Sequence, residues 1–221
     1  MDIKQLAKAT KQKKGPAHEW VFSCLRNAIV KGDFPPGMQL KQDEISAALC
    51  VSHIPVREAL RQLEAQGLVR IHPNRGAQVS KLSREMLEDM MEVRAYLSAS
   101  LLKSAVPSMS NADIKRLADI LEAQKQESDL IKAEKLNYRF HQVLTGRARN
   151  HVGEIMIEIM HANIDRYLRT AFYSKEETRC VSISEHEQIL KACRARDAQL
   201  ASDLLLGHIL ATRSRIPADI Q

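Results

Sequence analysis

The chain has 221 residues and a formal net charge of +6; 27% of its residues are charged and 44% are hydrophobic. This composition is typical of a soluble globular protein with one large domain or two small ones. No apolar run approaches the roughly 18 residues that span a membrane, and the first twenty residues lack the apolar core of a signal peptide. We therefore expect a cytoplasmic protein with no membrane partner, whose four cysteines are free, small apolar residues.

The excess positive charge lies in the first third of the chain. Residues 1–81 contain 13 Lys and Arg against 7 Asp and Glu, whereas residues 82–221 contain 20 of each. This asymmetry favours an N-terminal module that faces a polyanion, although a solvated basic surface would show the same excess.

The first elements follow the order of a winged helix-turn-helix domain. After a flexible basic arm over residues 1–16, apolar residues recur at helical spacing over 17–31, and "FPPG" ends that helix. A short helix is expected over 42–49, then a turn and a second helix that Ser52 caps. The stretches "LVRI" and "AQVS" flank "HPNRG" and predict a hairpin. Residues 17–81 are therefore predicted to form a DNA-binding domain.

The second helix of this domain is the expected DNA-reading element. His53, Arg57 and Arg61 are four residues apart and share one face, while the opposite face is apolar and can pack on the domain. Arg57 lies near the helix N-terminus, where an arginine can contact guanine through two hydrogen bonds. The other candidate contacts, to phosphates or the minor groove, are Lys41, Ser52, Arg75 and Gly76. A merely surface-charged helix is the alternative interpretation.

The pattern changes at residue 82. No strand signal appears from there to residue 214, and apolar residues recur at helical spacing. We predict six helices, over about 83–106, 110–127, 129–146, 149–172, 179–195 and 197–214. The predicted fold class is mainly α: a winged helix-turn-helix over 17–81, an all-α helical-bundle effector domain over 82–214, and a tail over 215–221.

Three histidines lie on the apolar faces of three different predicted helices. His141 follows Asn137 by four residues in "LNYRFHQVL", His186 lies in "VSISEHEQILKAC", and His208 lies in "DLLLGHILATR". A single buried histidine is more often structural than a metal ligand. Three of them in one bundle favour a metal site, and imidazole nitrogens suit Zn²⁺ or Ni²⁺.

Arg94 falls at the centre of an apolar stripe in "MLEDMMEVRAYLSASLL". A buried guanidinium needs an anionic or carbonyl partner. An acidic side chain of the same protein is one such partner. The carboxylate of a bound effector is the other, with Ser98 one turn further along as a second contact.

The residues quoted so far resemble those of a known family. The run "VSHIPVREALRQLEAQGLV" and the later "RGAQV" are similar to the DNA-binding domain of GntR-type bacterial transcription regulators, and the helical segment after them resembles the FCD effector domain. The resemblance covers about residues 17–214. It implies a homodimeric regulator, not an enzyme, that binds a short palindromic operator in double-stranded DNA and responds to a small ligand. We expect a repressor, but repression or activation depends on where the operator lies, which the chain does not encode.

The resemblance also implies a ligand set. The FCD domain places an acid, a histidine four residues later, a third ligand in an "EH..I" helix and a last histidine in the final helix. These correspond to Asn137, His141, His186 and His208. The resemblance likewise suggests that Arg94 binds the carboxylate of a small effector.

Three positions depart from the family pattern. His53 stands where arginine is usual and cannot make the two-pronged guanine contact, so we hypothesise that the operator differs at the base read there. Cys50 stands where glycine is usual in the turn. Asn137 replaces an aspartate, so a divalent ion among three neutral imidazoles would be uncompensated. We therefore hypothesise a modest metal affinity that rises when an anion binds.

Other functions fit parts of the pattern. A three-histidine site can activate water, as in a metalloenzyme. However, no HExxH motif is present, and no general base is evident because Glu185 and Glu187 need not face the ion. A DNA-compacting protein would not need a buried arginine or inward histidines. A metal-independent regulator that binds its effector directly is also an alternative.

Overall fold

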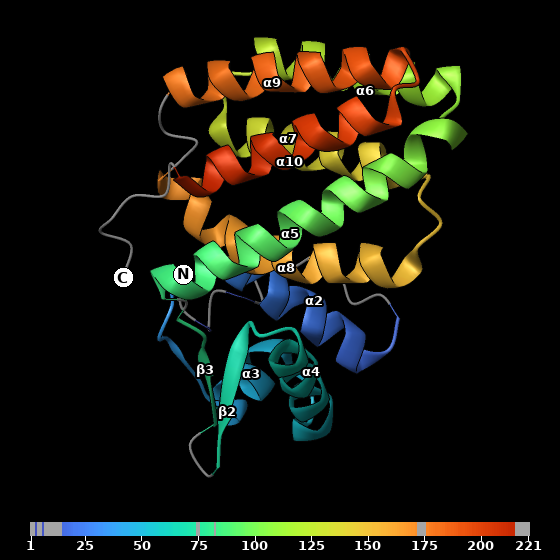
Figure 1. Cartoon of the computed structure of the whole chain (residues 1–221). Coiled ribbons are helices and arrows are strands. Elements are labelled where there is room, and N and C mark those ends of the chain that lie inside the picture. The colour runs from blue at the N-terminus through green and yellow to red at the C-terminus, as the bar shows by residue number, and fades with distance from the viewer. Residues whose placement is uncertain are drawn as a thin grey trace. The chain divides into compact units, whose positions relative to one another are not determined.

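The computed structural model describes residues 3, 6, 15–73, 76–81, 83–171 and 176–214 (Figure 1). Contacts within the chain divide it into two units, residues 1–82 and residues 83–220. Most of the predicted N-terminal arm, Arg75 and the predicted tail over 215–221 lie outside the described residues. Within the part that the structure describes, no helix is long and apolar enough to cross a membrane.

The first unit combines helices with a three-stranded sheet. The helices are α2 (Ala17–Val30), α3 (Gln42–Leu49) and α4 (His53–Ala65), and the strands are β1 (Gln39–Leu40), β2 (Val69–His72) and β3 (Gly76–Val79). The strands pair antiparallel in the order β1-β3-β2. This is the arrangement of a winged helix-turn-helix. The predicted helices and hairpin are confirmed, whereas β1 escapes prediction because a two-residue strand shows no alternation.

The apolar faces of α2 and α4 pack together and form the core of this unit. Val21, Leu25 and Ile29 from α2 are fully buried, as is Leu63 from α4. Each such side chain contributes roughly 1.5–3 kcal/mol through the apolar surface it removes from water. Because this face of α4 is buried, the polar face of the helix points outward.

The turn between α3 and α4 contains a left-handed residue. Cys50 ends α3 with φ 52° and ψ 46°. This region costs a residue with a Cβ atom about 1–2 kcal/mol, which is why glycine is common just after helices. The free cysteines are confirmed, but Cys50 and Cys180 are exposed, so only Cys24 and Cys193 behave as buried apolar residues.

Replacing Cys50 by glycine is expected to stabilise the first unit by about 1 kcal/mol, because glycine adopts this conformation without the Cβ penalty. Urea unfolding of the full chain, followed through the fluorescence of Trp20, measures the change. Cys50→Ala is the control, since it removes the thiol but keeps Cβ, and it should give no gain. Equal stability of the two variants would show that the turn is not strained.

The second unit is an all-α bundle over its described residues. Its helices are α5 (Arg84–Ala105), α6 (Asn111–Gln126), α7 (Leu130–Thr145), α8 (His151–Ala171), α9 (Glu176–Arg194) and α10 (Ala198–Ser214), with a 3-10 turn over Val106–Ser108. The six predicted helices are confirmed, with ends displaced by up to three residues. Side-chain caps explain two helix starts. Ser110 and Asp113 form a reciprocal capping box on α6, and Asp129 accepts two amide hydrogens of α7.

Helix α5 packs against α7, α8 and α10 (Figure 1). The Ser202 hydroxyl of α10 donates a hydrogen bond to the carbonyl of Ala99 at 3.0 Å. At the other end of the contact, the Arg213 guanidinium donates to Glu92 at 2.6 Å. This packing buries one face of α5, including Arg94 and Ser98.

Candidate functional site

Three histidines come together inside the second unit: His141 from α7, His186 from α9 and His208 from α10. One nitrogen of each ring lies within 4.8 Å of the corresponding nitrogens of the other two. The Nε2 atoms of His186 and His208 are 3.3 Å apart. The His141 ring centroid lies 5.2 Å from that of His186 and 5.4 Å from that of His208. The structure therefore gathers the predicted histidines at one point.

Burial sets the protonation state of this cluster. His186 is fully buried, with its ring centroid 4.3 Å from that of Phe140, and loss of solvation lowers the pKa of His186 well below its usual value, helped by His208. Burial also lowers the pKa of His141, and the neighbouring imidazoles and Arg94 add to this effect. Both rings are therefore neutral at pH 7, which is the form in which histidine binds metals.

A carboxylate orients the third ring. Glu185 Oε2 lies 2.7 Å from His208 Nδ1. Because an ionised carboxylate can only accept, Nδ1 carries the proton and the lone pair of a neutral ring is on Nε2, which faces His186. Proteins fix ligating histidines through contacts of this kind. Glu185, which was expected only to flank His186, thus lies directly behind His208.

The cluster fits a divalent transition metal. Two nitrogens that each bind one ion at about 2.1 Å are roughly 3.0–3.4 Å apart, and the 3.3 Å between the Nε2 atoms of His186 and His208 lies in that range. His186 Nδ1 is buried and has no hydrogen-bond partner among the described residues, and an ion bound at Nε2 would not supply one. Zn²⁺ and Ni²⁺ suit three neutral imidazoles. Asn137 lies one turn before His141 and is half-buried.

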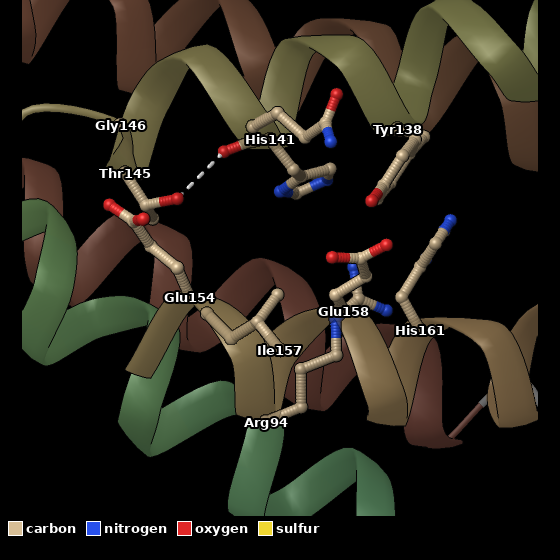
Figure 2. A pocket seen from close by; sticks show the side chains of 10 residues that line it. Arg94, Tyr138, His141, Thr145, Gly146, Glu154, Ile157, Glu158 and His161 are labelled. Carbon is tan, nitrogen blue, oxygen red and sulfur yellow. Dashed lines mark hydrogen bonds between the residues drawn. The ribbon is translucent and has the colours of Figure 1, made fainter. Parts of the chain in front are cut away.

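A pocket of about 300 Å³ opens beside the cluster, between α5, α7 and α8 (Figure 2). Its polar lining includes His141, Arg94, Tyr138, His161, Glu154 and Glu158. His141 belongs to both the cluster and the pocket, so a molecule in the pocket reaches the edge of the cluster. The volume is at the lower end of the range for small-molecule sites.

Arg94 supplies the positive charge of the pocket. It is 8% exposed, and its side chain extends from α5 into the pocket (Figure 2). Ser98, one turn further along α5, is also buried but is not among the residues that line the pocket. Of the two predicted effector contacts on α5, the structure therefore places only Arg94 at the pocket.

Helix α8 contributes lining residues to which the sequence analysis assigned no role. The His161 ring stacks on Tyr138 with centroids 3.9 Å apart and planes 4° apart. Glu154 and Glu158 also face the pocket. Residues 154, 158 and 161 share one helix face, and this spacing is the only signal of them in the sequence. This face of α8 lines a pocket only because α5 and α7 lie opposite it.

The polar face of α4 is exposed in the first unit. His53, Arg57 and Arg61 all lie on this open face, and His53 Nδ1 is 3.6 Å from Asp43 Oδ1. Ile54, which the sequence analysis did not consider, is 60% exposed in the first turn of α4. An exposed apolar side chain at this point is suited to contact a thymine methyl group.

Two of the predicted phosphate contacts flank this helix. Ser52 holds the N-cap position of α4, but its side chain makes no capping hydrogen bond. The predicted N-cap position is therefore confirmed, whereas the hydroxyl is left without a capping hydrogen bond and Ser52 is exposed. Lys41 is also exposed and forms an ion pair with Glu44 at 3.0 Å.

Gly76 has a steric reason to be glycine. It has φ 80°, and a Cβ atom there would lie 2.8 Å from the carbonyl oxygen of Leu40. Strand β3 therefore passes β1 too closely for a side chain at this position. Gly76 pairs with His72 at the end of the hairpin and so positions the wing.

An exposed basic reading helix in one unit and a buried histidine cluster beside a pocket in the other define a DNA-binding regulator with a ligand-binding domain. The profile of the bacterial regulatory proteins of the gntR family matches residues 18–79, and that of the FCD domain matches residues 89–211. The chain belongs to the gntR family and carries an FCD domain. It is thus a transcription regulator and not an enzyme.

Known proteins resemble the chain over most of its length. The transcriptional repressor RspR of Escherichia coli K12 is 27% identical over 88% of this chain and 86% of its own. The repressor GlaR of the same organism is 28% identical over 86% of this chain and 90% of its own. The solved structure of McbR/YncC from E. coli has the same fold, with a TM-score of 0.74 over 91% of this chain and 97% of its own, at 20% identity.

The hydrogen bond from His208 to Glu185 predicts a role for this carboxylate in metal affinity. Glu185→Gln is expected to weaken Zn²⁺ binding about 10- to 100-fold, because the amide no longer holds the ring by a charged acceptor. Competition with a coloured zinc chelator measures the affinity, and circular dichroism checks the fold.

Glu187→Gln is the matched control for this experiment. It makes the same change two residues away, where Glu187 pairs with Lys125 at 2.7 Å on the surface. Zinc affinity should be unchanged in this variant. Equal losses in both variants would remove the special role of Glu185.

Proposed function

We propose that this transcription regulator binds a palindromic operator as a homodimer and changes its DNA affinity when a small carboxylate occupies the pocket beside a divalent metal. The observation that carries this proposal is the convergence of His141, His186 and His208 beside a pocket that His141 and Arg94 both line. Because the family acts on genomic DNA, we also propose that the protein works in the cytoplasm.

The proposed dimer follows from the reading helix. Each chain has one α4, which can enter one major groove, and a two-fold dimer places two such helices on the half-sites of a palindrome. Arg57 and Arg61 would read bases and Ser52 and Lys41 would contact phosphates, because all four are exposed on or beside this face. The named relatives RspR and GlaR are repressors, and this supports repression as the mode of action.

The chain's own residues would position the effector. Arg94 offers a cation for a carboxylate, and His141 brings the edge of the cluster to the same pocket. A divalent ion held by the three histidines would add positive charge and a coordination position for the carboxylate. Glu185 would keep His208 in the ligating tautomer.

Helix α5 is the proposed route from the pocket to the DNA. It carries Arg94 and begins at Arg84, directly after the first unit ends at residue 82. A ligand that shifts α5 therefore acts on the segment that leads to the reading domain. The helix is also packed against α10 along its length, so it moves with the bundle as a rigid element.

A metal-independent regulator is the second candidate, and one distance favours it. The 3.3 Å between His186 Nε2 and His208 Nε2 is also within reach of a hydrogen bond. Glu185, His208 and His186 would then form a chain of hydrogen bonds without an ion. In this case the effector would bind Arg94 and His141 directly.

Selection of binding sites from a random DNA pool by the full chain tests the regulatory proposal. We expect a palindromic consensus with half-sites about one helical turn apart. His53→Arg is expected to change the preferred base pair at one position in each half-site. The physical reason is that arginine makes a two-pronged guanine contact worth about 1–3 kcal/mol, which histidine cannot make.

His151→Arg is the control for this selection. It makes the same substitution at an exposed position of the second unit, where the side chain is 86% exposed. Its consensus should equal that of the wild type. No enrichment of any site by the wild type would overturn the proposed operator binding, and identical sites for His53→Arg would remove the reading role of His53.

A further inference from the structure

The pocket beside the histidine cluster has a mixed charge. Among its lining residues are one arginine, Arg94, and two glutamates, Glu154 and Glu158. A ligand that carries both a negative and a positive group could therefore meet a side chain of opposite sign at each of them.

The charges are distributed along the pocket. Figure 2 shows Glu154 beside Thr145 at one end, whereas Tyr138 and His161 lie at the other end. Arg94 and Glu158 extend into the part of the pocket nearer to His161, and His141 lies between the two ends (Figure 2). A ligand carboxylate at Arg94 and His141 would therefore leave the remainder of the molecule directed towards Glu154.

Glu154 keeps its acceptor capacity for a ligand. The Nδ1 atom of His151 lies 4.0 Å from the carboxylate, which is too far for a hydrogen bond. The neighbouring Thr145 hydroxyl donates instead to the carbonyl of His141 at 3.2 Å, as the dashed line in Figure 2 shows. Among the described residues, no side chain hydrogen-bonds the Glu154 carboxylate.

We propose that the effector is a small amino acid with separated charges, whose carboxylate lies at Arg94 and His141 and whose ammonium group lies at Glu154. This inference rests on the proposed effector site and names its ligand class. The ammonium group would donate hydrogen bonds to the Glu154 carboxylate, an acceptor that no described side chain uses. A pocket of about 300 Å³ suits a molecule of this size.

Solvent weakens the preference that we expect for a ligand with an ammonium group over one without it. The Glu154 side chain is 42% exposed, so its charge is partly screened. Two opposite charges about 4 Å apart in a water-like surrounding correspond to a roughly fivefold preference. We therefore expect a selectivity of about fivefold or more for the ammonium group, rather than an absolute requirement.

Pairs of ligands that differ only in the ammonium group provide the test. In the pairs 3-aminopropanoate and butanoate, 4-aminobutanoate and pentanoate, and 5-aminopentanoate and hexanoate, a methyl group replaces the ammonium group. Isothermal titration of the full chain, with and without Zn²⁺, gives the affinity of each. We expect the amino member of at least one pair to bind about fivefold more tightly or better.

Two variants test whether Glu154 causes the preference for the amino member of a pair. Glu154→Gln should abolish the difference within that pair, because the charge is lost while the shape is kept. Asp203→Asn is the matched control, since Asp203 is an exposed acid of α10 that bonds Gln199 at 2.8 Å and does not line the pocket. It should leave the difference intact.

The outcomes separate this inference from the proposed function. Aliphatic acids that bind as tightly as their amino partners would overturn the inference and leave the carboxylate site standing. A preference that survives Glu154→Gln would also overturn it. Binding of neither member of any pair would overturn both the inference and the proposed site at Arg94.

Discussion

The hydrogen bond between Glu185 and His208 is the contact on which the second unit's chemistry depends. At 2.7 Å it fixes the tautomer of a buried ring and points the other nitrogen at His186. Burial keeps His141 and His186 neutral, so three lone pairs can converge without electrostatic repulsion between charged rings. The same carboxylate also supplies a negative charge close to any ion held there, which lessens the consequence of an amide at Asn137.

The two halves of the proposed effector site share one residue. His141 lines the pocket and belongs to the cluster, and its backbone carbonyl accepts the hydrogen bond of Thr145 on the same helix. In the proposed function, a ligand in the pocket would meet the cluster at His141 on α7 and would meet α5 at Arg94. Because α5 follows the first unit directly in the chain, the proposed ligand would contact the helix that connects to that unit.

The periodicity of apolar residues was sufficient to predict the helices and to place His186 and His208 on buried faces, because each helix must bury one stripe. It also placed Arg94 at the centre of such a stripe. It could not reveal Glu185, because whether a residue beside His186 reaches another helix depends on how α9 and α10 pack. Nor could it reveal Glu154 and His161, whose face of α8 looks like any polar surface until α5 and α7 are placed opposite. Ser52 shows a further limit of sequence patterns. The sequence places it correctly at the start of α4, but does not reveal that its hydroxyl makes no hydrogen bond to the helix.

The central claim is that the cluster and the pocket form one site in which metal and carboxylate bind cooperatively. Titration of the chelator-treated full chain with Zn²⁺, with and without saturating pentanoate or 4-aminobutanoate, tests it most directly. The account predicts that a carboxylate tightens metal binding by about 5- to 150-fold, a usual range for coupled sites, and that the gain shrinks in Asn137→Asp, which supplies its own charge. Zinc affinity that neither carboxylate nor Asn137→Asp changes would contradict it.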